Sequence, residues 1–109
     1  MKAIRLSTTD NVATLLGDVE KNDVVEIISA ENVVISKITA LQKITFGNKI
    51  ALNVINNGSH IIKCGHAIGK SIVEIPLGQL VHVQNVRSER LDIPEHIIEE
   101  IIKVMEIEQ

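Results

Sequence analysis

The sequence predicts a small, mainly β domain followed by one carboxy-terminal amphipathic helix. Hydrophobic residues make up 45% of the 109 residues but aromatic residues only 1%, so the core must consist of isoleucine, valine and leucine. Side chains branched at Cβ favour strands over helices. A chain of this length supplies one hydrophobic core, and we therefore expect a single β domain.

A turn pattern recurs four times: an apolar residue is followed three positions later by Gly or Asn and six positions later by a second apolar residue. The copies are Val19-Asn22-Val25, Ile44-Gly47-Ile50, Ile55-Gly58-Ile61 and Ile75-Gly78-Val81. Gly and Asn tolerate positive φ, so each copy predicts a turn that leads into a strand. Further strands are expected at residues 33–38 and 49–54. The irregular spacing indicates a mainly antiparallel, barrel-like domain rather than stacked repeats.

The carboxy-terminal segment has a helical period. Apolar residues recur at Ile97, Ile98, Ile101, Ile102 and Met105, and the charged Glu99, Glu100, Lys103 and Glu106 take the other face. Asp92 is expected to cap this helix, with Pro94 in its first turn and Glu95 completing a capping box. We therefore divide the chain into a β domain, residues 1–90, and a helix, residues 91–109, packed on that domain or on a partner.

Composition also argues against several classes of function. The net charge is -3 and Phe46 is the sole aromatic residue, so neither a phosphate-tracking field nor a stacking platform is expected for nucleic acid. Cys64 is the single cysteine, which excludes an internal disulfide framework and a multi-thiolate metal site. The first eleven residues lack an unbroken apolar segment, so we expect a cytoplasmic protein without membrane association.

Three longer motifs follow one another in the second half of the β domain. They are Phe46-Gly47-Asn48-Lys49-Ile50-Ala51-Leu52, Ile62-Lys63-Cys64-Gly65-His66-Ala67-Ile68-Gly69 and Gly78-Gln79-Leu80-Val81-His82-Val83-Gln84-Asn85. In order and spacing they resemble the SAF domain at the amino terminus of altronate and galactarate dehydratases, a family that includes the small subunit of sulfolactate sulfo-lyase. The resemblance extends over about residues 3–87 and implies a small β-clip fold.

The resemblance further implies a small subunit or accessory domain of a sugar-acid dehydratase, acting on altronate- or galactarate-like hydroxy acids beside a larger catalytic chain. The sequence has no His/Asp/Glu cluster with metal-ligand spacing. We expect no cofactor on this chain alone, and a divalent metal only in the assembled enzyme. The expected partners are a large dehydratase-like subunit and a small sugar-acid ligand, with a homo-oligomer left open.

An alternative of another class is a non-catalytic carbohydrate-binding or oligomerisation module. Similar SAF domains form the antifreeze-like, sugar-binding part of sialic acid synthases. Two departures from the dehydratase pattern favour this alternative: Asn48 and Gln84 stand where that pattern has histidines. An amide can hydrogen-bond a sugar hydroxyl but cannot act as a general base at neutral pH.

His82 is the one catalytic candidate, because it matches the first histidine of the family's His-x-His-Asn motif. Lys49, Lys63 and Asn85 match retained positions, and an ammonium group can meet a substrate carboxylate. With Asn48 and Gln84 they make up the predicted substrate-binding set, although a structural role stays open for each. We expect Lys49, Lys63, His82 and Asn85 to converge on one edge of the domain. Cys64 is expected to be a small buried side chain.

Overall fold

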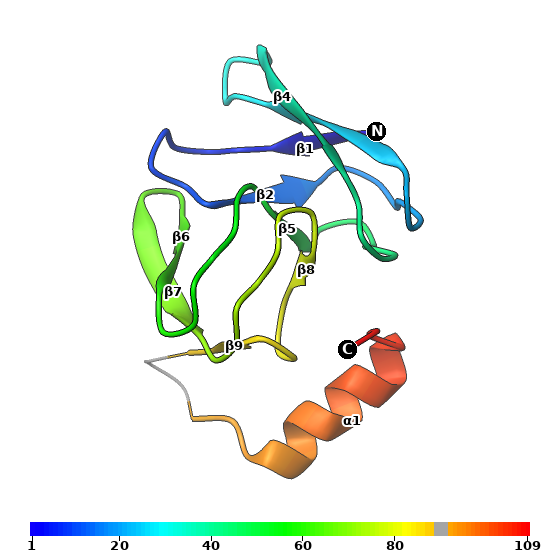
Figure 1. Ribbon diagram of the computed structural model, residues 1–109, viewed down its shortest axis with the longest axis vertical. Coiled ribbons are helices and arrows are strands. Elements are labelled where there is room, and N and C mark those ends of the chain that lie inside the picture. Colours follow the sequence, from blue (N-terminus) through cyan, green and yellow to red (C-terminus); the bar gives the residue numbers. More distant parts are fainter. Residues whose placement is uncertain (89–91) are drawn as a thin grey trace.

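The computed structural model describes residues 1–88 and 92–109, which form two β-sheets and one helix (Figure 1). The elements are β1 (Lys2–Ile4), β2 (Val12–Leu15), β3 (Val24–Ile28), β4 (Val34–Thr39), β5 (Lys49–Ala51), β6 (His60–Lys63), β7 (His66–Ser71), β8 (Leu80–Val81), β9 (Val86–Arg87) and α1 (Glu95–Met105). The prediction of a mainly β domain with a carboxy-terminal helix is confirmed. In the described ranges no helix is long and apolar enough to cross a membrane.

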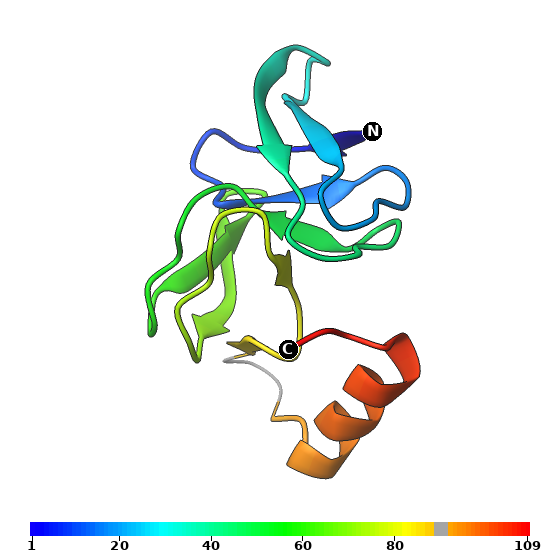
Figure 2. The same cartoon turned by 45° about the vertical axis from the view of Figure 1, so that its right-hand side comes forward.

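The larger sheet has the strand order β4-β3-β1-β2-β5-β8, and the smaller one has the order β6-β7-β9. Neighbouring strands are antiparallel except for β1 and β3, which are parallel. The larger sheet curls, and α1 lies beneath its β8 end, far from β4 (Figures 1 and 2). The mainly antiparallel prediction therefore holds, with one parallel pair that the sequence pattern did not indicate.

The four copies of the turn pattern pair with one another. Val19 forms an isolated antiparallel bridge with Ile44, and Ile55 forms another with Ile75. All four of these first residues are buried. The Gly or Asn that follows each of them has positive φ: Asn22 75°, Gly47 84°, Gly58 85° and Gly78 90°. The predicted turns are confirmed, and the bridges show that the repeated apolar residues join the turns in pairs.

The core is aliphatic, as the composition predicts. One cluster of buried side chains lies within the larger sheet and includes Leu15, Ile27 and Ile50. A second cluster, which includes Ile55, Ile61 and Ile75, lies toward the smaller sheet. Phe46 is 66% exposed, so the one aromatic ring takes no part in either cluster.

The predicted capping box of α1 is wrong. Pro94 is the N-cap residue and no side chain caps the helix, because Glu95 is already the first helical residue and Asp92 lies three positions before it. The Pro94 carbonyl accepts hydrogen bonds from the backbone N–H groups of Ile97 and Ile98, at 3.0 and 3.2 Å. The Glu95 carboxylate turns instead to Arg87 of β9.

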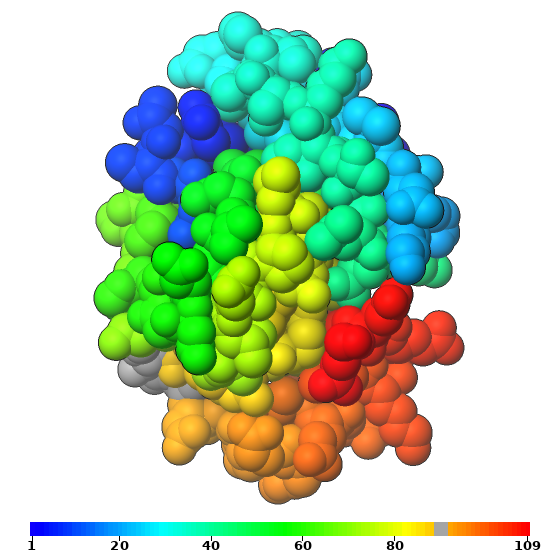
Figure 3. Space-filling view, viewed as in Figure 1, coloured from blue at the N-terminus to red at the C-terminus, as the bar shows by residue number. Residues whose placement is uncertain are grey.

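The helix is packed on the β domain at its carboxy-terminal end as well. Glu106 has φ 55° and ends the helix, and the Ile107 N–H donates to the Ile102 carbonyl at 3.0 Å. This turn carries Ile107 into the larger core cluster, while Gln42 Nε2 donates to the Glu108 carbonyl at 3.0 Å. In Figure 3 the carboxy-terminal segment, orange and red, covers the lower end of the domain.

Candidate functional site

Sheet register places Lys49 and His82 side by side. Lys49 begins β5 and pairs with Val81 of β8, and His82 directly follows that strand. Both side chains are half-buried. Burial, and then the nearby Lys63 ammonium, lower the pKa of Lys49. Burial, and then the nearby Lys49 ammonium, lower the pKa of His82 from its ordinary value of 6.5.

Lys63 lies near Lys49 but belongs to the smaller sheet. It ends β6 at a two-residue turn in which Cys64 and Gly65 have φ values of 53° and 76°, a combination typical of tight hairpins. Cys64 is exposed at this turn, so the expectation of a buried thiol is wrong. The reason is that residue 64 lies in the turn between β6 and β7 rather than within a strand.

Asp10 fixes the turn that carries Lys63. It is 8% exposed. Its Oδ2 accepts hydrogen bonds from the backbone N–H groups of Cys64, at 2.9 Å, and Ser7, at 3.0 Å, and its Oδ1 accepts one from Gly65 at 2.9 Å. Asp10 was not singled out in the sequence analysis. The available signal was the Asp10-Asn11 pair directly before the strand that begins at Val12.

Asn11, the next residue, also joins the smaller sheet to β2. Its Oδ1 accepts a hydrogen bond from the Ile62 N–H at 2.8 Å, and its Nδ2 donates to the His60 carbonyl at 3.0 Å. Asp10 and Asn11 therefore hold the end of β6 against β2. In this way two polar residues near the amino terminus position a lysine more than fifty residues further along the chain.

Asn85 holds the turn after β8 and is only 2% exposed. Its Oδ1 accepts a hydrogen bond from the His82 N–H at 3.0 Å. Its Nδ2 donates to the Leu80 carbonyl at 2.8 Å and to Gln79 Oε1 at 3.3 Å. The amide is thus engaged within the turn that presents His82, and Asn85 acts on the site through the backbone.

The other two predicted amides also bond within the chain. Gln84 Nε2 donates to the Leu80 carbonyl at 2.9 Å, and its Oε1 is buried without a hydrogen-bond partner in the described part of the chain. Asn48 Nδ2 donates to Thr45 Oγ1 at 2.8 Å. Asn48 borders a separate depression near Met105 and Ile107. Of the predicted residues, the structure brings together Lys49, Lys63 and His82.

A cavity of about 370 Å³ lies between the strands and α1. Its charged and polar lining comprises Lys49, His82, Arg87, Ser88, Asp92 and Glu95, and its apolar lining comprises Ile68, Val83, Val86, Ile93 and Ile98. Helix α1 and the residues just before it therefore form one wall, which the three motifs did not predict. Arg87 was likewise missed, because it follows the last motif.

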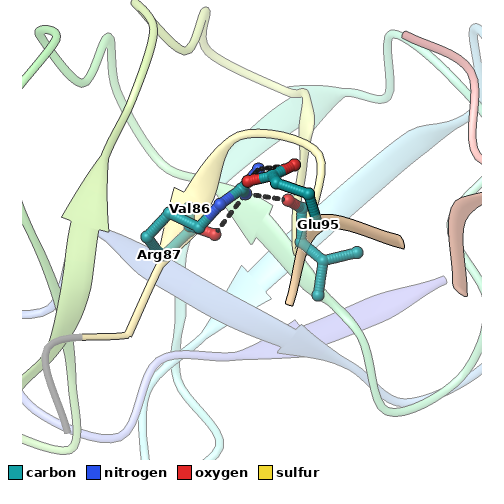
Figure 4. Close-up of polar contacts among 4 residues, drawn as sticks. Val86, Arg87 and Glu95 are labelled. Carbon is teal, nitrogen blue, oxygen red and sulfur yellow. Dashed lines mark hydrogen bonds and ion pairs between the residues drawn. The ribbon is translucent and has the colours of Figure 1, made fainter. Parts of the chain in front are cut away.

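Arg87 bridges the two walls of this cavity (Figure 4). Its Nη2 lies 3.2 Å from Glu95 Oε1, and its Nη1 donates to the carbonyls of Val83 and Val86. The guanidinium is therefore held in place, and its charge is partly balanced by Glu95. The Lys49 and Lys63 ammonium groups lie close enough to repel each other, so two positive charges meet at the corner formed by Lys49, Lys63 and His82.

The described residues do not fit a divalent metal. In ranges 1–88 and 92–109 no three or more His, Cys, Asp and Glu side chains are grouped so that they could hold one. His82 lies beside the Lys49 ammonium, which repels a cation. The same corner suits a small anion: ammonium groups attract a carboxylate, and a neutral imidazole can exchange a proton with a hydroxyl.

The fold and this corner define a small β domain in which Lys49, Lys63 and His82, from three sequence motifs, meet at one partly buried corner. The chain belongs to the altronate/galactarate dehydratase SAF domain family, whose model matches residues 1–89. It is 32% identical over 96 residues to an altronate dehydratase of Escherichia coli (strain K12), covering 88% of this chain and 18% of that protein. An altronate dehydratase of Bacillus subtilis (strain 168) is 33% identical over 90 residues, covering 83% and 17%.

Two facts follow from the extent of these matches. The chain spans less than a fifth of the length of either relative. The family match ends at residue 89, so helix α1, which forms one wall of the cavity, lies beyond the matched domain.

Proposed function

We propose that this SAF domain is the small subunit or accessory domain of a cytoplasmic sugar-acid dehydratase. In this proposal it acts on altronate- or galactarate-like hydroxy acids together with a larger catalytic chain. The observation that carries the proposal is the meeting of Lys49, Lys63 and His82, from three separate motifs, at one partly buried corner. Family membership supplies the class of substrate.

Each residue has a distinct part in the proposal. Lys49 and Lys63 attract the substrate carboxylate, and their mutual repulsion is relieved when an anion binds between them. His82, whose pKa is lowered, is neutral at pH 7 and can accept a proton from, or hydrogen-bond to, a hydroxyl of the bound sugar acid. Asn85 keeps the His82 backbone in place.

Elimination of water from a hydroxy acid requires more groups than this corner offers. A base must take the proton beside the carboxylate, an electrophile must stabilise the enediolate, and an acid must assist the leaving hydroxyl. We assign the groups not supplied by His82 and the lysines, and any divalent metal, to the larger chain. The limited coverage of the altronate dehydratases supports this division.

Binding of galactarate to the ¹⁵N-labelled chain tests the ligand assignment. We expect galactarate to shift the amide signals of Lys49, Lys63 and His82, and galactitol, which has the same hydroxyls but no carboxylate, to leave them unchanged. Lys49→Met should abolish the shifts, whereas Lys70→Met, at an exposed lysine of β7, should not. Shifts confined to other surfaces would refute the assignment.

Activity tests the subunit role. The isolated chain should not dehydrate altronate or galactarate, and a 2-oxo acid product should form when a large dehydratase-like chain from the same genome is added. Turnover by the isolated chain with a divalent metal, lost in His82→Ala, would instead show that the chain is itself the enzyme.

A second candidate is a non-catalytic carbohydrate-binding or oligomerisation module. The amides of Asn48, Gln84 and Asn85 bond within the chain, which favours a fixed binding surface over one that moves protons. Ile97, Val104 and Met105 form an exposed apolar strip on α1, which favours association. Galactarate binding without any gain of turnover on adding the large chain would support this candidate.

A further inference from the structure

We propose that the Lys49 amine is a nucleophile that forms an imine with the carbonyl group of a small 2-oxo acid bound in the cavity between β5, β8 and α1. Lys49 lines this cavity together with His82 and Arg87. Register with Val81 fixes its backbone at the start of a sheet strand, so the amine is presented from a rigid element rather than from a loop.

The surroundings of Lys49 are those that activate an amine. Ile68, Val83, Val86 and Ile98 supply apolar walls, and Lys63 lies close enough to repel the ammonium form. Desolvation and a neighbouring cation both favour the neutral, nucleophilic amine. The lowered pKa of Lys49 is consistent with this geometry.

Several charged groups surround the cavity. Lys63 and His82 lie near the amine, and Arg87, Asp92 and Glu95 line the same space. Arg87 is paired with Glu95 at 3.2 Å, so the two charges largely offset each other. Asp92 also lines the cavity, so the positive charge nearest the amine is that of Lys63, and this charge favours a carbonyl compound that carries a carboxylate.

The reaction is a condensation in which no electron is gained or lost. The Lys49 nitrogen lone pair attacks the carbonyl carbon, and one proton moves from nitrogen to oxygen. The resulting carbinolamine then loses its hydroxyl group and the remaining N–H proton as water, which leaves a C=N bond. The neutral imidazole of His82 lies beside Lys49 and can carry these protons. One carbonyl compound is consumed and one water is released.

The choice of a 2-oxo acid rests on the proposed function. Loss of water from a 2,3-dihydroxy acid gives an enol that becomes a 2-oxo acid, so the ligand would be the product of the proposed reaction. Imine formation itself depends only on the Lys49 cavity, so the two ideas can fail separately.

Reductive trapping tests the inference on the full-length chain. The protein is incubated near neutral pH with pyruvate and sodium cyanoborohydride, whose hydride reduces an imine to a stable secondary amine, and the adducts are located by peptide mass spectrometry. The chain has eight lysines, so the exposed Lys70 and Lys103 serve as internal controls. Adducts at the amino-terminal amine are counted separately.

We expect Lys49 to be labelled at least severalfold faster than Lys70 or Lys103, since a lowered pKa leaves more of the amine in its free, nucleophilic form. A folded Lys49→Arg variant should lose this fast phase. If Lys49→Arg does not fold, the relative labelling rates of the lysines in the unaltered chain test the inference by themselves. Equal labelling of Lys49 and Lys70 would overturn the inference.

The outcome is separable from that of the proposed function. Galactarate-induced shifts without fast labelling of Lys49 would support the ligand assignment and refute imine formation. Fast labelling of Lys49 without galactarate binding or dehydratase activity would support imine formation and refute the proposed function.

Discussion

Arg87 donates hydrogen bonds to both carboxylate oxygens of Glu95, at 3.2 and 3.5 Å, and so joins β9 to the first turn of α1. This contact and the buried Ile98 attach the start of the helix to the β domain. The contact also forms part of the cavity wall beside Lys49 and His82.

Loss of this ion pair should cost little stability. The Glu95 side chain is 71% exposed, and exposed pairs contribute about 0–1 kcal/mol. Glu95→Gln should therefore lower the free energy of unfolding by less than about 1 kcal/mol in urea titration. Glu99→Gln, on the same helix, is the matched control. A loss well above that range would mean that the pair determines whether the helix docks.

Asp10→Asn should be far more damaging. The Asp10 carboxylate accepts three backbone N–H groups, and an amide must turn its NH₂ group toward at least one of them. Because hydrogen bonds to charged groups are worth about 1.5–3 kcal/mol, we expect a loss of about 2–3 kcal/mol in urea denaturation. Asp23→Asn is the control, since the Asp23 side chain accepts one exposed N–H, that of Glu20. Equal losses would contradict the assigned role of Asp10.

Gly78 and Gly58 form a matched pair for the turn pattern. Both have positive φ, at 90° and 85°, but a Cβ at Gly78 would lie 2.3 Å from the Thr39 carbonyl oxygen, whereas one at Gly58 would meet nothing within 4 Å. Gly58→Ala should cost only the backbone strain of about 1–2 kcal/mol. Gly78→Ala should cost at least about 3 kcal/mol, because a clash is added to that strain. Similar melting temperatures for the two variants would refute the difference.

Much of the fold could be predicted from local chemistry. The turn pattern located positive φ at Asn22, Gly47, Gly58 and Gly78, and the helical period located α1, because both depend on residues close in sequence. The bridges of Val19 with Ile44 and Ile55 with Ile75 could not be predicted. Pairing partners in a sheet depend on topology, which a single sequence pattern does not specify.

The contacts around the candidate corner could be predicted only in part, for the same reason. Lys49, Lys63 and His82 carry motif positions and do meet. Asp10 and Arg87 lie outside the three motifs, and their roles arise from contacts with residues 64–65 and with Glu95. The capping box failed because the helix begins at Glu95, with Pro94 rather than Asp92 at the N-cap, and the Glu95 carboxylate bonds Arg87 instead. Long-range polar contacts were therefore the main source of error.

Replacement by alanine should have different effects on the buried and the exposed apolar side chains of α1. Ile98 is 2% exposed and Val104 is 72% exposed. Ile98→Ala should lower the free energy of unfolding by about 2–4 kcal/mol, since it removes buried atoms and leaves a cavity. Val104→Ala should change it by less than about 0.5 kcal/mol.

Deletion of residues 92–109 removes Ile107 from the core and should expose the apolar side chains that it covers. The deletion should therefore promote association, which size-exclusion chromatography would detect.

The His82–Lys49 relationship predicts a pH dependence with a definite sign. Because the pKa of His82 is lower in the folded chain than its ordinary 6.5, the unfolded chain binds more protons as the pH falls below that value. The contribution of neutral His82 to stability is therefore fully present above about pH 6.5 and is lost as the pH falls toward the folded-state pKa. His82→Gln should flatten this part of the stability curve, whereas His66→Gln, at an exposed histidine, should not.

The same pair supplies a spectroscopic test of the cause. Burial lowers the pKa of His82 first and the Lys49 charge lowers it further, so Lys49→Met should raise that pKa while leaving it below 6.5. Titration of the His82 Cε1–H resonance by NMR measures this directly, with Lys70→Met as the charge-matched control. A rise in Lys70→Met as large as that in Lys49→Met would mean that net charge, rather than the neighbouring ammonium, sets the His82 pKa. An unchanged His82 pKa in Lys49→Met would show that the Lys49 charge does not affect His82.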